Sequence, residues 1–352
     1  MLIRAHSPLT GIPAVELVHF PNDAPVLFVT RHGIPQVTYD ELKRIMPTGI
    51  ARDHMVQAIV VGGAANPAVM KQLQQLGMKS DTITAPNPFE LANKIDAYYG
   101  KIQNPDLGVP QMGGSASTGG NGIQDVMVGN IHAWQYMLPA THWASHMPTG
   151  LLWVTGHTIP APTRAALARR GGHAMIYVWG GPAQVAPSVV RQLAKYGSVM
   201  RITNNDPVAY NQPPVDTPSA TSIAFAKMWD PAGMVGWNIT GPGHGFTLLN
   251  LNSPYAWQQA VGSSILSHLG FHAPLLLSTS GSTLPSSIRG YLASVAPTFL
   301  VSPADGPYNM TYVLGSYSDI SWNEQTQVDR VSGMANRHVW NQNTGSVYIP
   351  PR

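Results

Sequence analysis

The chain has 352 residues, which is long enough for two or three domains and a sizeable core. Only 11% of the residues are charged, against roughly 25% in an ordinary soluble domain, and the net charge is +3 without any run of lysine or arginine. This composition gives no support to a nucleic-acid-binding function. The absence of cysteine excludes disulfides, thiolate metal sites and cysteine nucleophiles.

The first part of the chain predicts strands followed by helices. Residues 1–22 are punctuated by proline and predict only a strand from Val15 to Phe20, so no clear leading strand is seen. An apolar run predicts a strand over Val26–Thr30, and a second strand ends at Gly62-Gly63. Helices are predicted from Pro67 to Gly77 and from Pro88, where Asn87 is the candidate N-cap.

The middle of the chain alternates strands and helices in the same way. A Gly- and Ser-rich stretch from Gln111 to Gly122 predicts a linker. The predicted elements that follow are strands over 125–128, 151–155 and 175–179, the last closed by Gly180-Gly181, and helices through Met137, through Leu167, from Pro187 to Gly197 and from Pro218 to Trp229. Strands that alternate with helices indicate a parallel α/β architecture.

The last part predicts one more unit and a tail. Ser253 caps a helix that carries Trp257 and Val261 on its apolar stripe. Strands are predicted over Leu275–Thr279 and Tyr312–Leu314. The pattern stops after Val331, and the tail ends in a short extended run over 346–349.

The three parts are related to one another. The turns Ile34-Pro35, Ile159-Pro160 and Leu284-Pro285 follow one another at intervals of 125 residues, and Leu42, Leu167 and Leu292 keep the same interval in the helices behind them. A period this long indicates three small domains and not a solenoid of short repeats. The predicted boundaries are 1–100 for the first repeat, 101–122 for the linker, 123–230 for the second repeat, 231–335 for the third and 336–352 for the tail.

The third repeat carries a family resemblance in Ala273–Thr279, Leu284-Pro285 and Tyr312–Gly315. With an apolar strand, a hydroxyl residue, a Leu/Ile-Pro turn and a second strand closed by glycine, it resembles the type 2 cell-wall-binding repeats of bacterial surface proteins. The resemblance implies three Rossmann-like or flavodoxin-like α/β repeats with parallel sheets about a pseudo-threefold axis. It also implies that the chain binds an anionic envelope polysaccharide without catalysis.

The resemblance further implies a location outside the cell or on its surface. Residues Met1–His6 do not contain the apolar core of a signal peptide, so the expectation is that the export signal is not part of this sequence. No segment approaches the about twenty apolar residues of a membrane span.

A binding surface is expected at the carboxyl ends of the parallel strands, where loops and helix starts gather. The candidate ligand-binding residues are Thr30, Arg31, His32, Thr155, His157, Thr279 and Ser280. Hydroxyl, imidazole and guanidinium groups suit sugar hydroxyls or phosphates, and Trp153 or Trp179 would stack on a sugar ring. The alternative is that these hydroxyls only cap the next turn and that both tryptophans belong to the core.

Metal and catalytic sites have little support. His142 and His146 share a helix face, but no acidic partner stands at zinc-hydrolase spacing, and a structural pair is the alternative. The Gly62-Gly63 and Gly180-Gly181 turns lack the full dinucleotide pattern. Gly113–Ser117 and Ser263 do not form a nucleophile elbow, and no carboxylates are paired. No cofactor and no enzyme activity are predicted; the alternative is an extracellular hydrolase or transferase.

Two functions outside catalysis remain open at this stage. One is binding of the anionic polymer, and the other is assembly of identical copies into a layer or filament, because a sparsely charged surface favours contact with like copies or neutral sugars. The tail strand near Ser346 is predicted either to complete the first repeat, in the same chain or a neighbour, or to be a loose terminus.

Overall fold

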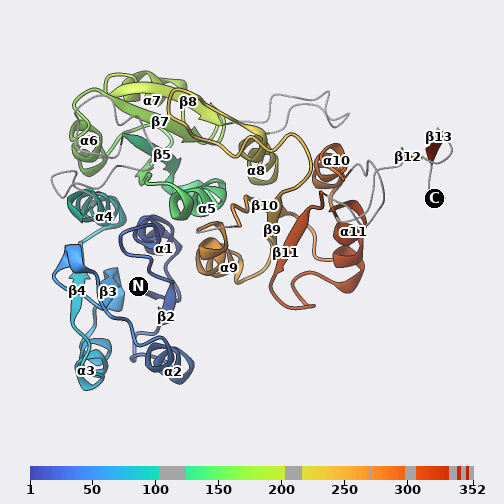
Figure 1. Cartoon of the computed structure of the whole chain (residues 1–352). Coiled ribbons are helices and arrows are strands. Elements are labelled where there is room, and N and C mark those ends of the chain that lie inside the picture. Colours follow the sequence, from blue (N-terminus) through green and yellow to red (C-terminus); the bar gives the residue numbers. More distant parts are fainter. Residues whose placement is uncertain are drawn as a thin grey trace.

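The computed structural model describes residues 1–102, 124–202, 216–268, 271–297 and 307–332, together with the strands over 339–341 and 346–348. Three separate parallel sheets dominate this part of the chain (Figure 1). Their strand orders are β2-β1-β3-β4, β6-β5-β7-β8 and β10-β9-β11. The predicted α/β class with three Rossmann-like or flavodoxin-like repeats is confirmed, and each sheet lies within one predicted repeat.

The sheets share one order because each repeat begins with a central strand and adds its neighbours through helical crossovers. The first sheet consists of β1 (Leu2–Arg4), β2 (Leu27–Val29), β3 (Ala58–Val61) and β4 (Ser80–Ile83). The second consists of β5 (Asp125–Asn130), β6 (Gly150–Val154), β7 (Ala174–Trp179) and β8 (Gly197–Ile202). The third consists of β9 (Gly245–Asn250), β10 (Leu275–Ser278) and β11 (Met310–Leu314).

Helices connect the strands in a matching order. The first repeat has α1 (Pro8–Ala14), the 3-10 helix η1 (Val15–Val18), α2 (Gln36–Ile45), α3 (Pro67–Gln75) and α4 (Pro88–Ile102), as well as the short 3-10 helices η2 (Ala51–Asp53) and η3 (Gly62–Ala64). The second has η6 (Ile131–Met137), α5 (Leu138–His146), α6 (Ala161–Ala168), α7 (Pro187–Leu193) and α8 (Pro218–Lys227). The third has α9 (Ala256–Ser263), the 3-10 helix η8 (Ser264–Ser267), α10 (Ser286–Ser294) and α11 (Trp322–Ser332). No described helix is long and apolar enough to cross a membrane.

The 125-residue repeat is visible in the backbone. Pro35, Pro160 and Pro285 each stand directly before the second helix of a repeat, with φ of −59°, −60° and −54° and ψ of 152°, 155° and 140°. Leucine at the same interval, at positions 42, 167 and 292, is buried in all three repeats. These turns therefore occupy equivalent surroundings, which is what the sequence interval predicts.

The first repeat corrects two predictions. It does have a leading strand, because β1 pairs with both β2 and β3, and α1 follows it. The predicted strand from Val15 to Phe20 is wrong: Val15–Val18 form η1, whose residues are all buried. Three residues, Leu2–Arg4, are too short to show strand periodicity, and their pairing is with residues far along the chain.

The tail contains two described strands. Its strands β12 (Val339–Asn341) and β13 (Ser346–Tyr348) pair with each other in an antiparallel hairpin. The first sheet contains β1 as its leading strand, and the described tail strands are not part of it, so docking of the tail on the first repeat stays a prediction. Most of the predicted linker 101–122 lies outside the described residues, and α4 extends to its second position, Ile102.

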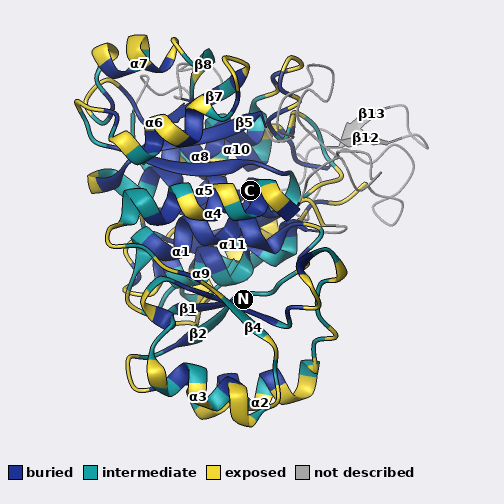
Figure 2. Cartoon of the chain, turned by 90° about the vertical axis from the view of Figure 1, so that its left-hand side faces the viewer, coloured by how far each residue is buried: buried dark blue, intermediate teal, exposed yellow. Residues whose placement is uncertain are grey.

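The first helices of the three repeats pack together at the centre. α1, α5 and α9 contact one another, and Figure 2 shows much of the centre dark with burial, while exposed residues are prominent on α2, α3 and α7. Each central helix also reaches the next sheet: α1 contacts β6, α5 contacts β10, and Trp257 of α9 meets Phe28 of β2 with ring centroids 5.7 Å apart. The repeats are thus joined in a cyclic order.

A buried ion network joins the first two repeats. Asp96 of α4 accepts hydrogen bonds from Arg169 at 2.5 Å and Arg170 at 2.6 Å, and Glu16 of η1 accepts one from the Leu151 N–H at 2.5 Å. Burial acts to raise the pKa of Asp96, but Arg170 and Arg169 outweigh it and hold this pKa below its ordinary value. Burial raises the pKa of Glu16 well above its usual range, and the nearby Asp96 adds to the rise.

Replacing Asp96 by asparagine is expected to destabilise the fold by about 3–5 kcal/mol, because the buried Arg170 guanidinium loses its counter-charge. Urea unfolding followed by circular dichroism measures the change. The matched control is Glu41→Gln, which removes an exposed pair with Arg44 and is expected to change the stability far less than Asp96→Asn does. Equal effects of the two substitutions would contradict the structural role given to the buried pair.

Candidate functional site

The loops after β2, β6 and β10 are built alike. The hydroxyls of Thr30, Thr155 and Ser280 each accept a hydrogen bond from the backbone N–H two residues ahead, at 3.1, 3.3 and 3.1 Å. Such bonds cap a turn and fix its shape. The capping alternative is therefore what the structure shows for these hydroxyls, and their role in ligand binding stays a prediction.

The first of these carboxyl edges is cationic. Arg31 and His32 are exposed, and the Arg31 Nε–H donates to His32 Nε2 at 2.8 Å. Arg4, at the end of β1, lies over Gly63, where an added Cβ would be 2.8 Å from its Cδ. The Gly62-Gly63 turn thus gives close packing for an arginine side chain, and Gly62 itself needs its φ of +59°.

The second edge carries exposed His157, whose loop is closed by a hydrogen bond from the Thr158 N–H to Thr155 Oγ1 and by a bond between the two hydroxyls. Gly180 adopts φ of +91° at the end of β7, and a Cβ on Gly181 would collide with the Asp216 carboxylate. The turn requires Gly180 for its positive φ, and the approach of the Asp216 carboxylate requires Gly181, which agrees with the structural alternative for this motif.

The third edge presents exposed aromatic rings. Tyr255 is 60% exposed, Tyr317 69% and Trp322 65%, and the rings of Tyr317 and Trp322 lie edge to face at 6.2 Å. Tyr255 stands in the loop after β9, Tyr317 in the loop after β11 and Trp322 at the start of α11, and β9 and β11 pair in the sheet. Around them are the polar residues Asn252, Thr279, Ser280, Ser282, Ser316, Ser318 and Asn323.

Asp319 holds the third edge in shape. Its Oδ1 accepts from the Ser253 hydroxyl at 2.5 Å, and its Oδ2 accepts from the Ser316 N–H and hydroxyl at 2.9 and 3.0 Å. These bonds, that from Ser253 first, hold the pKa of Asp319 below its ordinary value. A charged carboxylate therefore ties the loop after β11 to the loop after β9 and fixes the platform that carries the three rings.

The predicted stacking tryptophans are in the core. Trp153 and Trp179 are both fully buried, and their indole N–H groups donate to Leu9 O and Met127 Sδ, each at 3.1 Å. Neither can stack on a sugar from solvent. The exposed rings, which the sequence reasoning missed, have a recognisable signal: Tyr317 and Trp322 are flanked by serine, asparagine or aspartate, whereas the buried tryptophans stand in apolar runs.

The two candidate metal-binding histidines, His142 and His146, contact different sets of residues. His142 is buried, with Nδ1 beside the Ser267 hydroxyl at 2.8 Å and Ala273 O at 3.0 Å, and Nε2 beside the Ser263 hydroxyl at 3.2 Å. These contacts tie α5 to the third repeat. Of the nucleophile candidates, Ser263 therefore lies in this interior contact, and Gly113–Ser117 lie outside the described residues.

His146 belongs to a cluster that the sequence reasoning missed. Its ring centroid lies 4.3 Å from that of His272, and the rings of His19 and His268 are 5.4 Å apart. His268 Nε2 also contacts Asp23 Oδ1 at 2.7 Å. The described residues contain no group of three or more histidine, aspartate or glutamate side chains with metal-binding geometry. His19, His146 and His268 come from the ends of the central helical segments of the three repeats.

Burial lowers the pKa of His146 to about 4, and His272 adds to this effect. A histidine with a lowered pKa in the folded state stabilises the fold above pH 6.5, the ordinary pKa, and loses this contribution as the pH falls toward 4.

We therefore expect wild-type protein to lose more stability than a His146→Gln variant between pH 6.5 and pH 4.5, by about 1.4 kcal/mol for each pH unit. Urea unfolding at several pH values measures both curves. His32→Gln is the control, since that side chain is exposed in the folded chain. Parallel curves for the wild type and His146→Gln would contradict the expectation.

Comparison with solved structures connects this arrangement to known proteins. Cwp6 from Clostridium difficile superposes with a TM-score of 0.69 at 14% identity, covering 98% of this chain and 45% of that one. Cwp8 from the same organism superposes with a TM-score of 0.63 at 12% identity, covering 94% of this chain and 46% of that one. This chain shares its fold with bacterial cell wall proteins.

The likeness is one of shape. This chain spans less than half the length of either structure. No model of a known protein family matches the sequence, and no curated protein is significantly similar to it. The resemblance to cell-wall-binding repeats, expected from the third repeat, is thus supported at the level of the fold.

Proposed function

We propose that this chain is a non-catalytic structural protein of the bacterial cell surface that binds an anionic envelope polysaccharide through the carboxyl edges of its sheets. The observation that carries the proposal is the exposed aromatic edge of the third repeat, with Tyr255, Tyr317 and Trp322. Large aromatic rings left in water by a folded protein are typical of recognition surfaces.

The chemistry of two edges suits such a polymer. Aromatic ring faces on the third edge pack against the apolar faces of sugar rings, and the surrounding serine and asparagine side chains hydrogen-bond to sugar hydroxyls. On the first edge, the Arg31 guanidinium pairs with acidic groups such as carboxylate or phosphate. The cell wall proteins that share this fold support a location on the cell surface.

Catalysis has no comparable support at the third edge. Asp319 is the sole carboxylate in the loops over 251–255, 279–283 and 315–323, and both its oxygens accept structural hydrogen bonds. A general acid and base acting on a sugar would need two carboxylates facing a shared space.

Self-assembly is the second candidate function. A charged fraction of 11% leaves little electrostatic repulsion between copies, so close packing into a layer or filament is physically accessible. It is compatible with polysaccharide binding, and sedimentation without any added polymer separates the two.

The test is co-sedimentation with purified cell wall from the organism that encodes the chain. We expect the protein to pellet with the wall, and a double variant Tyr317→Ala, Trp322→Ala to lose at least about tenfold in apparent affinity, since base or sugar stacking contributes ~1–3 kcal/mol per ring. The control is Trp229→Ala, which removes an exposed ring away from this edge.

Three outcomes are informative. Pelleting with the wall that the double variant weakens supports binding at the third edge. Pelleting without wall supports self-assembly as the main function. Protein that stays in solution under both conditions contradicts both functions and reopens the hydrolase or transferase alternative.

A further inference from the structure

The last helix of a repeat covers the edge strand of the next repeat. α4 packs along β6 and α6, and α8 packs along β10 and α10. Beneath these two helices, every residue of β6 and of β10 is buried. Helix donation from one repeat to the next is therefore the regular way in which this chain closes the outer edge of a sheet.

The corresponding edge of the first sheet has no such cover. Leu27 and Phe28 of β2 are only partly buried, and in the described part of the chain no helix runs along β2 as α4 and α8 run along β6 and β10. The cyclic order explains the difference. The third repeat would have to supply the covering helix, but its last described helix, α11, packs on β11 and α10 of its own repeat.

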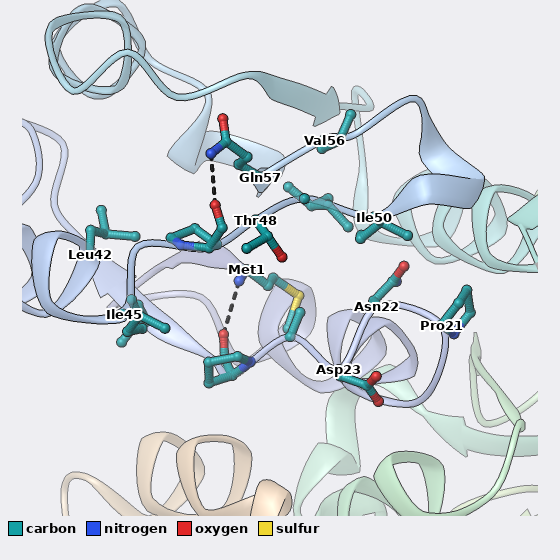
Figure 3. A pocket seen from close by; sticks show the side chains of 16 residues that line it. Met1, Pro21, Asn22, Asp23, Leu42, Ile45, Thr48, Ile50, Val56 and Gln57 are labelled. Atoms are coloured by element: carbon teal, nitrogen blue, oxygen red, sulfur yellow. Dashed lines mark hydrogen bonds between the residues drawn. The ribbon is translucent and has the colours of Figure 1, made fainter.

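A pocket of about 340 Å³ lies at this uncovered place (Figure 3). Leu42 and Ile45 of α2 line one side, and Asn22 and Pro21 lie on the opposite side, with Val56 before β3 also lining the pocket. The volume and the apolar walls suit several inserted side chains better than water.

The 125-residue interval identifies the residues of the second and third repeats that correspond to Ile45 in the wall of the pocket. Ile45 corresponds to Arg170 and to Val295. Arg170 is covered by Asp96 of α4 at 2.6 Å, and Val295, only 1% exposed, belongs to one apolar cluster with Ile223 and Ala226 of α8. A helix thus covers this position in the second and third repeats, and the apolar first repeat resembles the third.

Asn22 supplies an independent sign of a missing partner. It is 9% exposed, and neither its Nδ2 nor its Oδ1 has a hydrogen-bond partner. A buried amide without partners costs about 1–3 kcal/mol. A ligand that enters the pocket with a polar group beside its apolar side chains would satisfy this amide.

We propose that the uncovered edge of the first repeat, formed by β2, the end of α2 and Asn22, is the docking site for an amphipathic helix of a separate protein. The contact face of that helix is apolar and carries one polar group for Asn22. Among the described residues, a second copy of this chain offers no equivalent helix, since α4 and α8 are buried against their neighbours and α2, α3, α6, α7, α10 and α11 bury residues within their own repeats. The described tail strands form a hairpin.

The probe is a helix-stabilised peptide with the sequence of residues 216–229, which contains α8, because α8 covers the apolar counterpart of this site. Binding of the dye-labelled peptide to the full chain is measured by fluorescence anisotropy. We expect saturable binding, and Ile45→Arg and Leu27→Asp are each expected to weaken it at least about tenfold. Circular dichroism verifies that both variants are folded.

Val37→Arg is the matched control, since Val37 is on α2 but 77% exposed, and it should leave binding unchanged. A peptide with Ile223→Asp should bind at least about tenfold more weakly than the parent. Absence of saturable binding up to about 1 mM peptide, or equal binding by Ile45→Arg and wild type, overturns the proposal.

Two further results would also overturn it by naming another occupant. Self-association of the wild type in sedimentation velocity that Ile45→Arg abolishes would assign the edge to a second copy. A gain of about tenfold in peptide affinity on deletion of residues 333–352 would assign it to the chain's own tail. Neither change is expected.

Discussion

The whole structure depends on the packing of α1, α5 and α9 against one another. These helices carry no fully exposed residue: α5 is buried from Leu138 to Ser145, α1 from Thr10 to Ala14, and α9 at four of its eight positions. By contrast, α2 and α3 each bury only two residues. Helices that are packed against one another at the centre carry mainly small or apolar residues, because charged side chains are seldom buried. This is one source of the low charge of the sequence.

Buried histidine and serine side chains in this centre are satisfied by neighbouring repeats. His142 contacts the hydroxyls of Ser263 and Ser267, and the Ser145 hydroxyl donates to Ser264 O at 2.6 Å. Satisfied buried polar groups specify one arrangement, because any other docking of the repeats would leave them without partners. Histidine and serine therefore serve here as contacts between repeats and not as a metal site or a nucleophile.

The sequence predicted those features of the fold that depend on local pattern. The Pro35, Pro160 and Pro285 turns, the leucines behind them and the Asn87 cap of α4 are set by residues close in the chain, and all are found. The strand β1 was missed because Leu2–Arg4 gain their strand geometry from β2 and β3, far along the chain. Trp322 is exposed and Trp153 is buried. Residue type alone could not distinguish them, whereas the polar neighbours of Trp322 and the apolar neighbours of Trp153 in the sequence do.

Gly11 has a consequence for the order in which the protein can be made. A Cβ at this position would lie 2.6 Å from Trp257, so the first helix is shaped to receive a ring that is synthesised some 246 residues later. A ribosome-bound chain with two finished repeats still exposes that helix face and the ring of Phe28 to water. The native centre closes only when α9 has emerged, so the growing chain stays in an aggregation-prone stage until the start of the third repeat has been synthesised.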